Sequence, residues 1–174
     1  MELWDLYDKD RHRTGKIHVR GEELPEELYH LVIHAWIRNG SNEYLIAQRS
    51  ASRPTFPLMW ECVGGSVLAG ESSLEGALRE IQEEVGLSLP PDSGICVDSV
   101  RRTVISGKKF NDILDIWLFR YDGEVTLENA TTDEVAGVKW MTPPQIQQLL
   151  DTGKLVDTLS YFFTKIAPYK GNFT

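Results

Sequence analysis

The residues with the clearest chemical potential are acidic and lie in one short segment. Glu80, Glu83 and Glu84 lie within five residues after Arg79, and spacings of three and four residues put such side chains on one face of a helix. Three carboxylates on one patch repel each other and raise one another's pKa unless a cation neutralises them. Because Mg²⁺ prefers carboxylate, water and phosphate oxygens, the pattern predicts a site for Mg²⁺ or Mn²⁺.

The residues around this acidic face must hold it in place. Leu74, Leu78, Ile81 and Val85 recur at helical spacing on the other side of the predicted helix and would anchor it to a sheet. We expect Ser72 or Ser73 to cap the start of the helix and Gly86 to end it. Before the helix, Gly64 and Gly65 predict a tight turn, in which a free carbonyl, that of Gly64, would face the metal.

A surface helix with a solvated glutamate face is the ordinary alternative. Two further residues weigh against this alternative, because Gly65 and Glu71 occupy the positions upstream of Arg79 that the following motif requires. Residues 65–87 match the pattern G-x5-E-x7-R-E-U-x-E-E-x-G-U, where U is aliphatic, at every fixed position. This pattern is the Nudix box, and the chain resembles the Nudix hydrolases, the MutT-like family.

The resemblance implies a fold, a reaction and a set of roles. The expected fold is an α/β/α sandwich with a mixed β-sheet, formed by a single domain over residues 1–174. The expected reaction is the Mg²⁺-dependent cleavage of a diphosphate linkage in a small phosphorylated substrate, such as a nucleoside diphosphate linked to another moiety, by attack of water at phosphorus. The catalytic and metal-binding residues would be Glu80, Glu83 and Glu84, with Arg79 orienting a glutamate. Glu71, Gly65 and Gly86 would support the site structurally.

The resemblance leaves two points open. Family members differ in which glutamate acts as the base, and a further acid from outside the box often contributes. Candidates for that acid are Asp112, Asp115, Asp133 and Glu134.

The remaining sequence predicts the elements of the sandwich from alternation, turn residues and helical periodicity. Predicted strands cover residues 31–37, 44–48, 60–63, 97–105, 113–121 and 135–141, after an N-terminal hairpin of residues 2–7 and 16–20. Two further helices are predicted at about residues 145–151 and 155–166.

A second resemblance extends towards the N-terminus. The hairpin, His30, residues 48–50 and residues 57–60 are similar to the Nudix branch that contains type I isopentenyl diphosphate isomerase. That isomerase needs a cysteine and a histidine where this chain has Gly64 and Ser66, and Cys62 lies too early. We therefore expect a hydrolase on an isomerase-like scaffold. The alternatives are an isomerase-like enzyme and a non-catalytic nucleotide-binding sensor.

Other chemically active side chains have ordinary explanations. Cys62 is expected to be a buried core thiol, and His30 and His34 are expected to be structural or to line the substrate. Four cations could meet phosphate, although each is more often a surface charge: Arg49, Arg53, Lys108 and Lys109. Four tryptophans are expected mainly in the core: Trp36, Trp60, Trp117 and Trp140.

Composition bounds the class of protein. The 174 residues carry a formal net charge of −8, without a basic stripe, which argues against a nucleic-acid polymer as partner. The sequence has no apolar run long enough to span a membrane and no visible signal peptide, and its two cysteines are too few for a disulfide framework. We expect a cytoplasmic enzyme whose partner is a small phosphorylated molecule, and a homodimer is left open.

Overall fold

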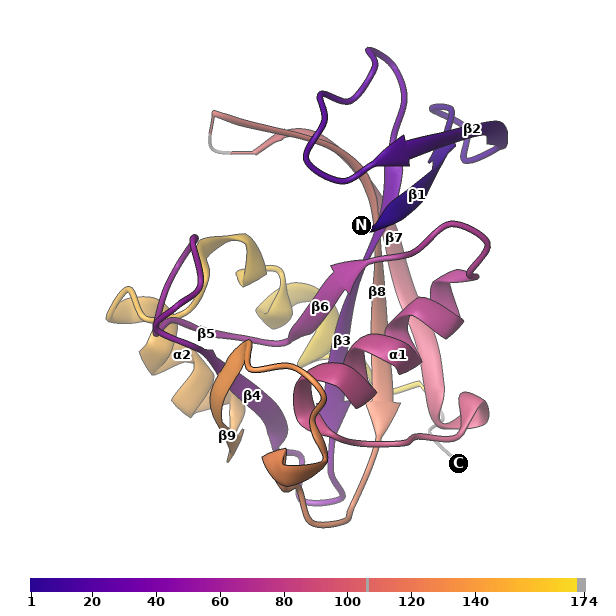
Figure 1. The fold of residues 1–174 in the computed structure, drawn as a ribbon. Helices are drawn as coiled ribbons and strands as arrows, with labels where there is room; N and C mark the ends of the chain where they lie inside the picture. Colours follow the sequence, from indigo (N-terminus) through magenta and orange to yellow (C-terminus); the bar gives the residue numbers. More distant parts are fainter. Residues whose placement is uncertain (106, 172–174) are drawn as a thin grey trace.

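A computed structural model describes residues 1–105 and 107–171, without the side chains of Ile105 and Lys108. Its main feature is a mixed sheet with helices on both faces, below a separate two-stranded hairpin (Figure 1). The sheet contains β3 (His30–Arg38), β4 (Tyr44–Arg49), β5 (Trp60–Glu61), β6 (Val63–Ser66), β7 (Gly94–Ile105), β8 (Lys108–Arg120) and β9 (Val135–Met141). The hairpin is β1 (Leu3–Tyr7) and β2 (Arg13–Val19). The helices are α1 (Ser73–Val85) and α2 (Pro143–Asp151), with short turns η1 (Pro91–Ser93), η2 (Leu127–Asn129), η3 (Asp157–Leu159) and η4 (Phe162–Ile166).

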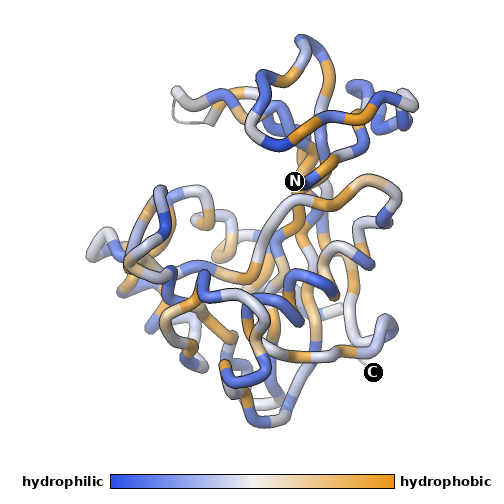
Figure 2. Tube along the Cα trace, in the orientation of Figure 1, coloured by the Kyte–Doolittle hydropathy of each residue, from blue (hydrophilic) through white to orange (hydrophobic). Residues whose placement is uncertain are grey.

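The sheet is built around β3, which covers the strand predicted over residues 31–37. Strand order is β5-β4-β3-β8-β7, with β6 also paired to β3 and β9 to β4, and the β3–β8 pair is parallel. On one face Ile33 packs in a core with Ile81 of α1. On the other face Trp36 packs in a second core with Ile146 of α2 and Phe162 of η4. Hydrophobic positions follow these strands through the centre of the molecule (Figure 2). The expected α/β/α sandwich with a mixed sheet is confirmed.

The ends of α1 form as its sequence predicts. The hydroxyl of Ser72 accepts a hydrogen bond from the amide of Glu75, and the amide of Ser72 donates to the Glu75 carboxylate at 2.7 Å. This reciprocal capping box fixes the first turn. At the other end Gly86 adopts the left-handed conformation, with φ of 73°, and its amide bonds to the carbonyl of Gln82.

The expected turn at Gly64 and Gly65 is wrong. The predicted strand at residues 60–63 divides at Cys62, and both glycines belong to the second part, β6. Strand β6 pairs antiparallel with β3, and Gly64 is opposite His34. The two glycines are therefore extended strand residues, which lie directly beside α1.

The expected final helix over residues 155–166 is also wrong. Its first residues follow β5 instead, since the amide of Val156 bonds to the carbonyl of Trp60 at 2.9 Å. Only η3 and the short π-helical turn η4 form beyond them. Phe162 and Ile166, four residues apart, are fully buried and account for the helical periodicity. None of the described helices combines the length and apolarity needed to cross a bilayer.

The predicted hairpin is present and is fixed to the sandwich by side chains. The Trp4 ring stacks on His30 of β3 at 4.1 Å between centroids. The Arg11 guanidinium binds both carboxylate oxygens of Asp115 in β8 at 2.5 Å. These contacts fix the hairpin to β3 and β8. They thereby place Glu2 and Arg20, which flank the hairpin strands, beside the glutamates of α1.

The end of α1 gives a test of this fold. Gly86→Ala should lower the free energy of unfolding by about 2–4 kcal/mol, since a left-handed alanine costs roughly 1–2 kcal/mol and overpacking adds to it. The added Cβ would lie 2.7 Å from the Asn129 backbone carbon. Gly15→Ala is the matched control, because Gly15 has φ of 77° but no neighbouring atom within 4 Å. Urea unfolding of both variants should show the larger loss for Gly86→Ala, and equal losses would contradict the packing described here.

Candidate active site

Helix α1 packs against β6 and β3, and Arg79 connects acidic side chains of the helix with β6. Its Nε donates to the Glu71 carboxylate at 2.8 Å, and its Nη1 donates to Glu80 at 2.9 Å and Glu83 at 3.0 Å. Its Nη2 donates to the backbone carbonyl of Ser66 in β6 at 2.9 Å. One guanidinium therefore joins α1, the segment before it and β6, and it fixes the directions of two glutamates.

The glycines of β6 leave room for this arrangement. A Cβ at position 65 would overlap the Glu80 carboxylate, and one at position 64 would lie 2.9 Å from the carbonyl oxygen of Ile33. Side chains at these positions would separate β6 from α1 and β3. The glycines are needed for close packing against a carboxylate and a neighbouring strand, not for a turn.

Most of the predicted site residues meet in one pocket of about 160 Å³. Glu80, Glu83 and Glu84 line it from α1, and Gly64, Gly65 and Ser66 line it from β6. The pocket also contains side chains that the sequence did not single out together: Glu2, Arg20, Arg53, Thr132 and Glu134. Glu2 and Arg20 come from the hairpin and form a salt bridge at 2.8 Å. The sequence did not predict that they line the pocket, because they reach it only through the contacts that fix the hairpin to the sandwich.

Burial raises the pKa of two glutamates of the pocket, Glu80 and Glu84. Burial raises the pKa of Glu80 to about 7, although Arg79 acts in the opposite direction. Glu84 is only 5% exposed, and no hydrogen bond or salt bridge in the described part of the chain reaches its carboxylate. Burial, followed by Glu80, Glu61 and Glu134, raises the pKa of Glu84 well above its ordinary value. A buried carboxylate without a counter-ion is costly when it is charged.

Glu61 is a further acid that sequence reasoning missed. It lies in β5, where burial raises its pKa despite its neighbour Arg49, whose Nη1 donates to it at 2.6 Å. Arg49 also donates through Nε to the carbonyl of Thr55 at 2.9 Å. This pair therefore anchors the loop between β4 and β5 that carries Arg53 to the pocket.

The four candidates for an outside acid are placed differently. Asp112 makes two hydrogen bonds of 2.6 Å to Arg102, and Asp115 is bound by Arg11 and Ser99, so both are committed to ion pairs in β8 away from the pocket. Asp133 is exposed and is not among the residues that line the pocket. Glu134 does line it, in a salt bridge of 2.7 Å with Arg53.

The other residues singled out in the sequence have structural environments. Cys62 is buried, which raises the pKa of its thiol well above the ordinary value. Burial lowers the pKa of His30 to about 4 and that of His34 to about 3, and His34 is hydrogen-bonded to the Tyr161 hydroxyl. Trp36 is fully buried, whereas three tryptophans are partly buried against the cores: Trp60, Trp117 and Trp140. Lys109 is exposed, and the side chain of Lys108 is outside the described part.

The donor chemistry of the pocket fits a hard divalent cation, but its side chains are not drawn together around one. No group of three or more His, Cys, Asp or Glu side chains in residues 1–105 and 107–171 is close enough to hold a metal ion. Glu80 and Glu83 are hydrogen-bonded to Arg79. Glu84 remains available, and the acids of the pocket outnumber its two arginines. All of these donors are oxygens, which Mg²⁺ and Mn²⁺ accept.

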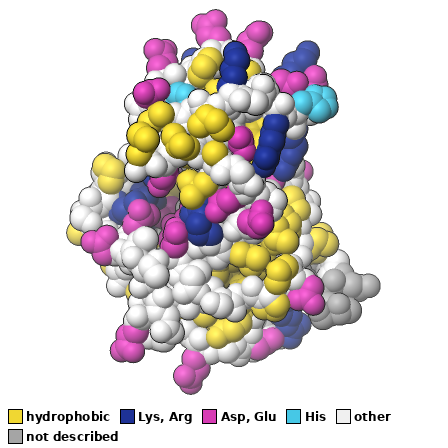
Figure 3. Space-filling model, turned by 45° about the vertical axis from the view of Figure 1, so that its right-hand side comes forward, with side chains coloured by type: hydrophobic (Ala, Val, Ile, Leu, Met, Phe, Trp, Pro, Cys, Tyr) yellow, Lys and Arg dark blue, Asp and Glu magenta, His cyan; other side chains and the backbone are white. Residues whose placement is uncertain are grey.

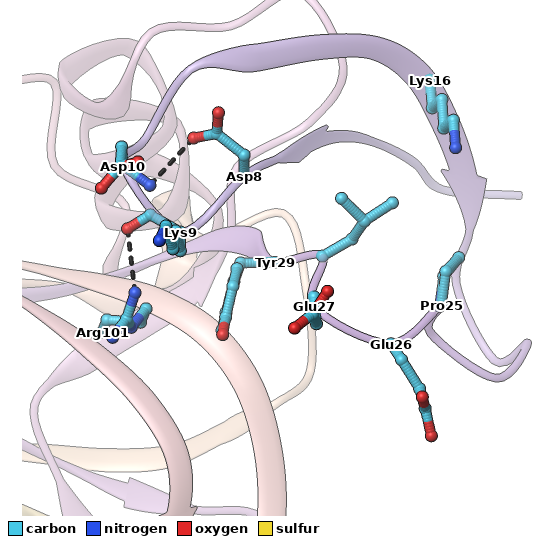
Figure 4. Close-up of a pocket in the computed structure, with 10 residues that line it drawn as sticks. Asp8, Lys9, Asp10, Lys16, Pro25, Glu26, Glu27, Tyr29 and Arg101 are labelled. Atoms are coloured by element: carbon cyan, nitrogen blue, oxygen red, sulfur yellow. Dashed lines mark hydrogen bonds between the residues drawn. The ribbon is translucent and has the colours of Figure 1, made fainter.

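A larger cavity of about 680 Å³ lies on another part of the molecule (Figure 4). It is bounded by the hairpin turn, the loop before β3 and Arg101 of β7. Arg101 donates to the carbonyl of Lys9 at 3.1 Å, and acids and lysines alternate along the walls. Charges of both signs are likewise interspersed on the face in Figure 3, whose described part has no continuous basic stripe. None of the α1 glutamates lines this cavity, so we place the chemistry in the smaller pocket.

Comparison with known proteins identifies the family. The model of the NUDIX domain matches residues 28–160. The chain belongs to the Nudix family. An uncharacterized Nudix hydrolase of Listeria monocytogenes is 33% identical over 164 residues, which cover 94% of this chain and 91% of the relative. The expected enzyme class, a Nudix pyrophosphohydrolase, is thereby confirmed.

More distant matches bear on branch and fold. Isopentenyl-diphosphate Delta-isomerase of Escherichia coli is 26% identical over 129 residues, with 73% of this chain and 69% of that enzyme covered, which supports the similarity to the isomerase branch. A crystal structure from Deinococcus radiodurans has the same fold, with a TM-score of 0.74, 21% identity and coverage of 95% and 99% of the two chains. The Nudix domain of a Shewanella oneidensis protein in complex with ADP-ribose is 17% identical, with a TM-score of 0.56 and coverage of 69% and 77%.

The raised pKa values predict how stability depends on pH without metal. Folding favours protonated Glu80 and Glu84, so their contribution to the stability of the metal-free protein should be complete below the ordinary pKa of 4.5 and be lost as pH rises towards about 7. Glu84→Gln should reduce this decline and leave folding intact or improved. Urea unfolding in EDTA across this pH range measures it.

The control for this test is Glu75→Gln in the same helix. Hydrogen bonds from Ser72 lower the pKa of Glu75, so this carboxylate stabilises the fold above its ordinary pKa and its replacement should leave the decline in place. An identical pH dependence of stability for wild type and Glu84→Gln would show that the charged form of Glu84 does not destabilise the fold.

Proposed function

We propose that this protein is a Mg²⁺-dependent hydrolase that cleaves a diphosphate linkage in a small phosphorylated substrate by attack of water at phosphorus. The observation that carries the proposal is the buried Glu84 carboxylate, which makes no hydrogen bond or salt bridge in the described structure and lies among other acids, whose effect on its pKa Arg53 opposes without reversing it. Mn²⁺ would replace Mg²⁺, because both are hard cations that accept oxygen ligands.

The residues that would hold the metal are Glu80, Glu83 and Glu84, with the Gly64 carbonyl as a backbone candidate. We add Glu134 as the acid from outside the box, because it is the one of the four candidates that lines the pocket. A bound divalent cation neutralises the diphosphate and lowers the pKa of a coordinated water. Without a cation, the carboxylates of the pocket repel one another and an anionic substrate. With a cation bound to this donor set, the pocket would become a binding site for such a substrate.

The protein's own side chains would carry out the remaining steps. The oxygen of water forms a bond to one phosphorus while one glutamate of Glu80, Glu83 and Glu84 accepts its proton. The bond from that phosphorus to the bridging oxygen breaks, and the second phosphate leaves with the bridging oxygen. Arg79 holds Glu80 and Glu83 in fixed directions during this step. Arg20 and Arg53, the two cations that line the pocket, are placed to exchange their present carboxylate partners for phosphate oxygens.

The organic part of the substrate is assigned more coarsely. A nucleoside diphosphate linked to another moiety is the class that we favour, and the ADP-ribose bound to the Shewanella relative belongs to it. We propose that residues 1–174 act as one domain, since the hairpin contributes Glu2 and Arg20 to the pocket of the sandwich. A cytoplasmic location fits such a substrate.

The environment of Cys62 and the residues at positions 64 and 66 fit an isomerase less well than a hydrolase. An isomerase would need an accessible thiol, but Cys62 is 2% exposed and its pKa is raised. Gly64 and Ser66 also occupy the positions where the related isomerase has its cysteine and histidine. The intact box equally disfavours a sensor without catalysis.

The central prediction is hydrolysis that depends on metal. Turnover of nucleotide sugars, dinucleotides or isoprenyl diphosphates should vanish in EDTA and return with Mg²⁺ or Mn²⁺. In ¹⁸O-labelled water, one labelled oxygen should enter a phosphate product, as mass spectrometry would show. Full activity after exhaustive chelation would refute the metal role, and products without label would refute attack by water.

Two substitutions separate hydrolase from isomerase. Cys62→Ala should retain hydrolysis within about tenfold, or roughly 1.4 kcal/mol of barrier. Glu83→Gln should lose about 10²–10⁴-fold, the typical contribution of a positioned acid–base group. Both variants should be assayed for diphosphate hydrolysis and for isopentenyl diphosphate isomerisation. If wild type isomerises and Cys62→Ala does not, the hydrolase assignment is wrong.

A further inference from the structure

A short loop brings Glu134 to the pocket, and it packs on the end of the catalytic helix. We name residues 129–134 the acid loop; it runs from the end of η2 to the start of β9. The side-chain amide of Gln82 donates to the carbonyl of Asn129 at 3.2 Å. Gly86 allows the contact, because an added Cβ would lie 2.8 Å from the amide nitrogen of Ala130. The acid loop therefore takes its position from the C-terminal turn of α1.

The strongest attachment of the acid loop is the backbone carbonyl of Glu83. It accepts hydrogen bonds from the amide of Thr131 at 3.0 Å, from the amide of Thr132 at 3.2 Å and from the Thr132 hydroxyl at 3.2 Å. The last four carbonyls of a helix have no partner within it and carry partial negative charge. A residue whose side chain lines the pocket thus also holds the acid loop through its backbone.

Glu134 is fixed from the opposite side by the loop after β4. Its carbonyl accepts a hydrogen bond from the amide of Ser50 at 2.8 Å, and its carboxylate binds Arg53 at 2.7 Å. Thr132 lies only two residues before Glu134, and both line the pocket. Glu134 therefore lies between residues that bond to α1, among them Thr132, and residues 50–53 of the loop after β4.

From this geometry we propose that Thr132 is a positioning residue, whose hydroxyl holds the acid loop on the Glu83 carbonyl and thereby places the Glu134 carboxylate opposite the glutamates of α1. The inference rests on the proposed function, in which Glu134 is the acid from outside the box. Thr132 acts through Glu134 and has no chemical step of its own.

Thr131 provides a matched control within the same loop. Both threonines are exposed, and both donate their amides to the same carbonyl. They differ in the side chain, because the Thr132 hydroxyl bonds to Glu83 and no such bond from the Thr131 hydroxyl exists in the described residues. Valine at either position keeps the shape and the amide and removes only the hydroxyl.

The experiment compares Thr132→Val, Thr132→Ser and Thr131→Val, each alone and with Glu134→Gln. Thr132→Val should lower kcat about three- to tenfold with little change in KM, consistent with the loss of one hydrogen bond. It should also weaken Mn²⁺ binding about three- to tenfold, measured by electron paramagnetic resonance without substrate. Thr132→Ser should restore both quantities, and Thr131→Val should match wild type. In the Glu134→Gln background, Thr132→Val should change kcat by less than about twofold, because its effect passes through Glu134.

The possible failures are distinguishable. If Glu134→Gln retains wild-type kcat and Mn²⁺ affinity, the proposed role of Glu134 is wrong and the inference falls with it. If Glu134→Gln is impaired but Thr132→Val equals Thr131→Val, the role of Glu134 stands and the positioning role of Thr132 is refuted. A full effect of Thr132→Val in the Glu134→Gln background would also refute it, since Thr132 would then act by another route.

Discussion

The Arg79 guanidinium binds Glu71, Glu80 and Glu83, while Glu84 is buried without a hydrogen bond or salt bridge in the described structure. The site depends on this constraint: the one positive charge of Arg79 is shared by three carboxylates and does not reach the fourth by a hydrogen bond. Arg79 orients Glu80 and Glu83 through hydrogen bonds, whereas Glu84 has no such bond, and burial raises the pKa of both Glu80 and Glu84. Removing charged carboxylates from water is unfavourable, so the metal-free fold carries a strain that a divalent cation would relieve. Binding of the cation and stabilisation of the fold are then the same event.

The surrounding elements can be understood as ways of keeping that constraint in place. The capping box at Ser72 and the left-handed Gly86 fix the two ends of α1, and Ile81 locks its apolar face onto β3. Gly65 lets β6 approach Glu80, so that the Ser66 carbonyl reaches Arg79. The hairpin and the loop after β4 then close the pocket with cations. Arg20 and Arg53 line the pocket, and each is held by a glutamate.

The sequence was most informative where local rules determine the structure. Helix α1, its caps and the shared face of its glutamates follow from spacing, and the strands β3, β4 and β9 follow from alternation and turn residues. The roles of Arg79 and Glu71 were implied by the resemblance to the Nudix family. It misled where tertiary contacts prevail. Gly64 and Gly65 resembled a turn, but the need for close packing keeps them in β6. Residues 155–166 have helical periodicity, yet pairing with Trp60 extends their first part. Among the four outside acids, only the ion pairs of Asp112 and Asp115 and the docking of the acid loop distinguish Glu134, and these join residues far apart in the chain.

The central claim is that Glu84 is a buried carboxylate whose charge requires a cation. The most direct measurement is the pKa of Glu84 by ¹³C NMR titration of its side-chain carboxyl, in chelator and with saturating Mg²⁺, with Glu84→Gln used to assign the resonance. The account predicts a pKa well above the ordinary 4.5 in chelator and a fall below 4.5 when Mg²⁺ is bound. An ordinary pKa in chelator, or a raised pKa that Mg²⁺ leaves unchanged, would contradict it.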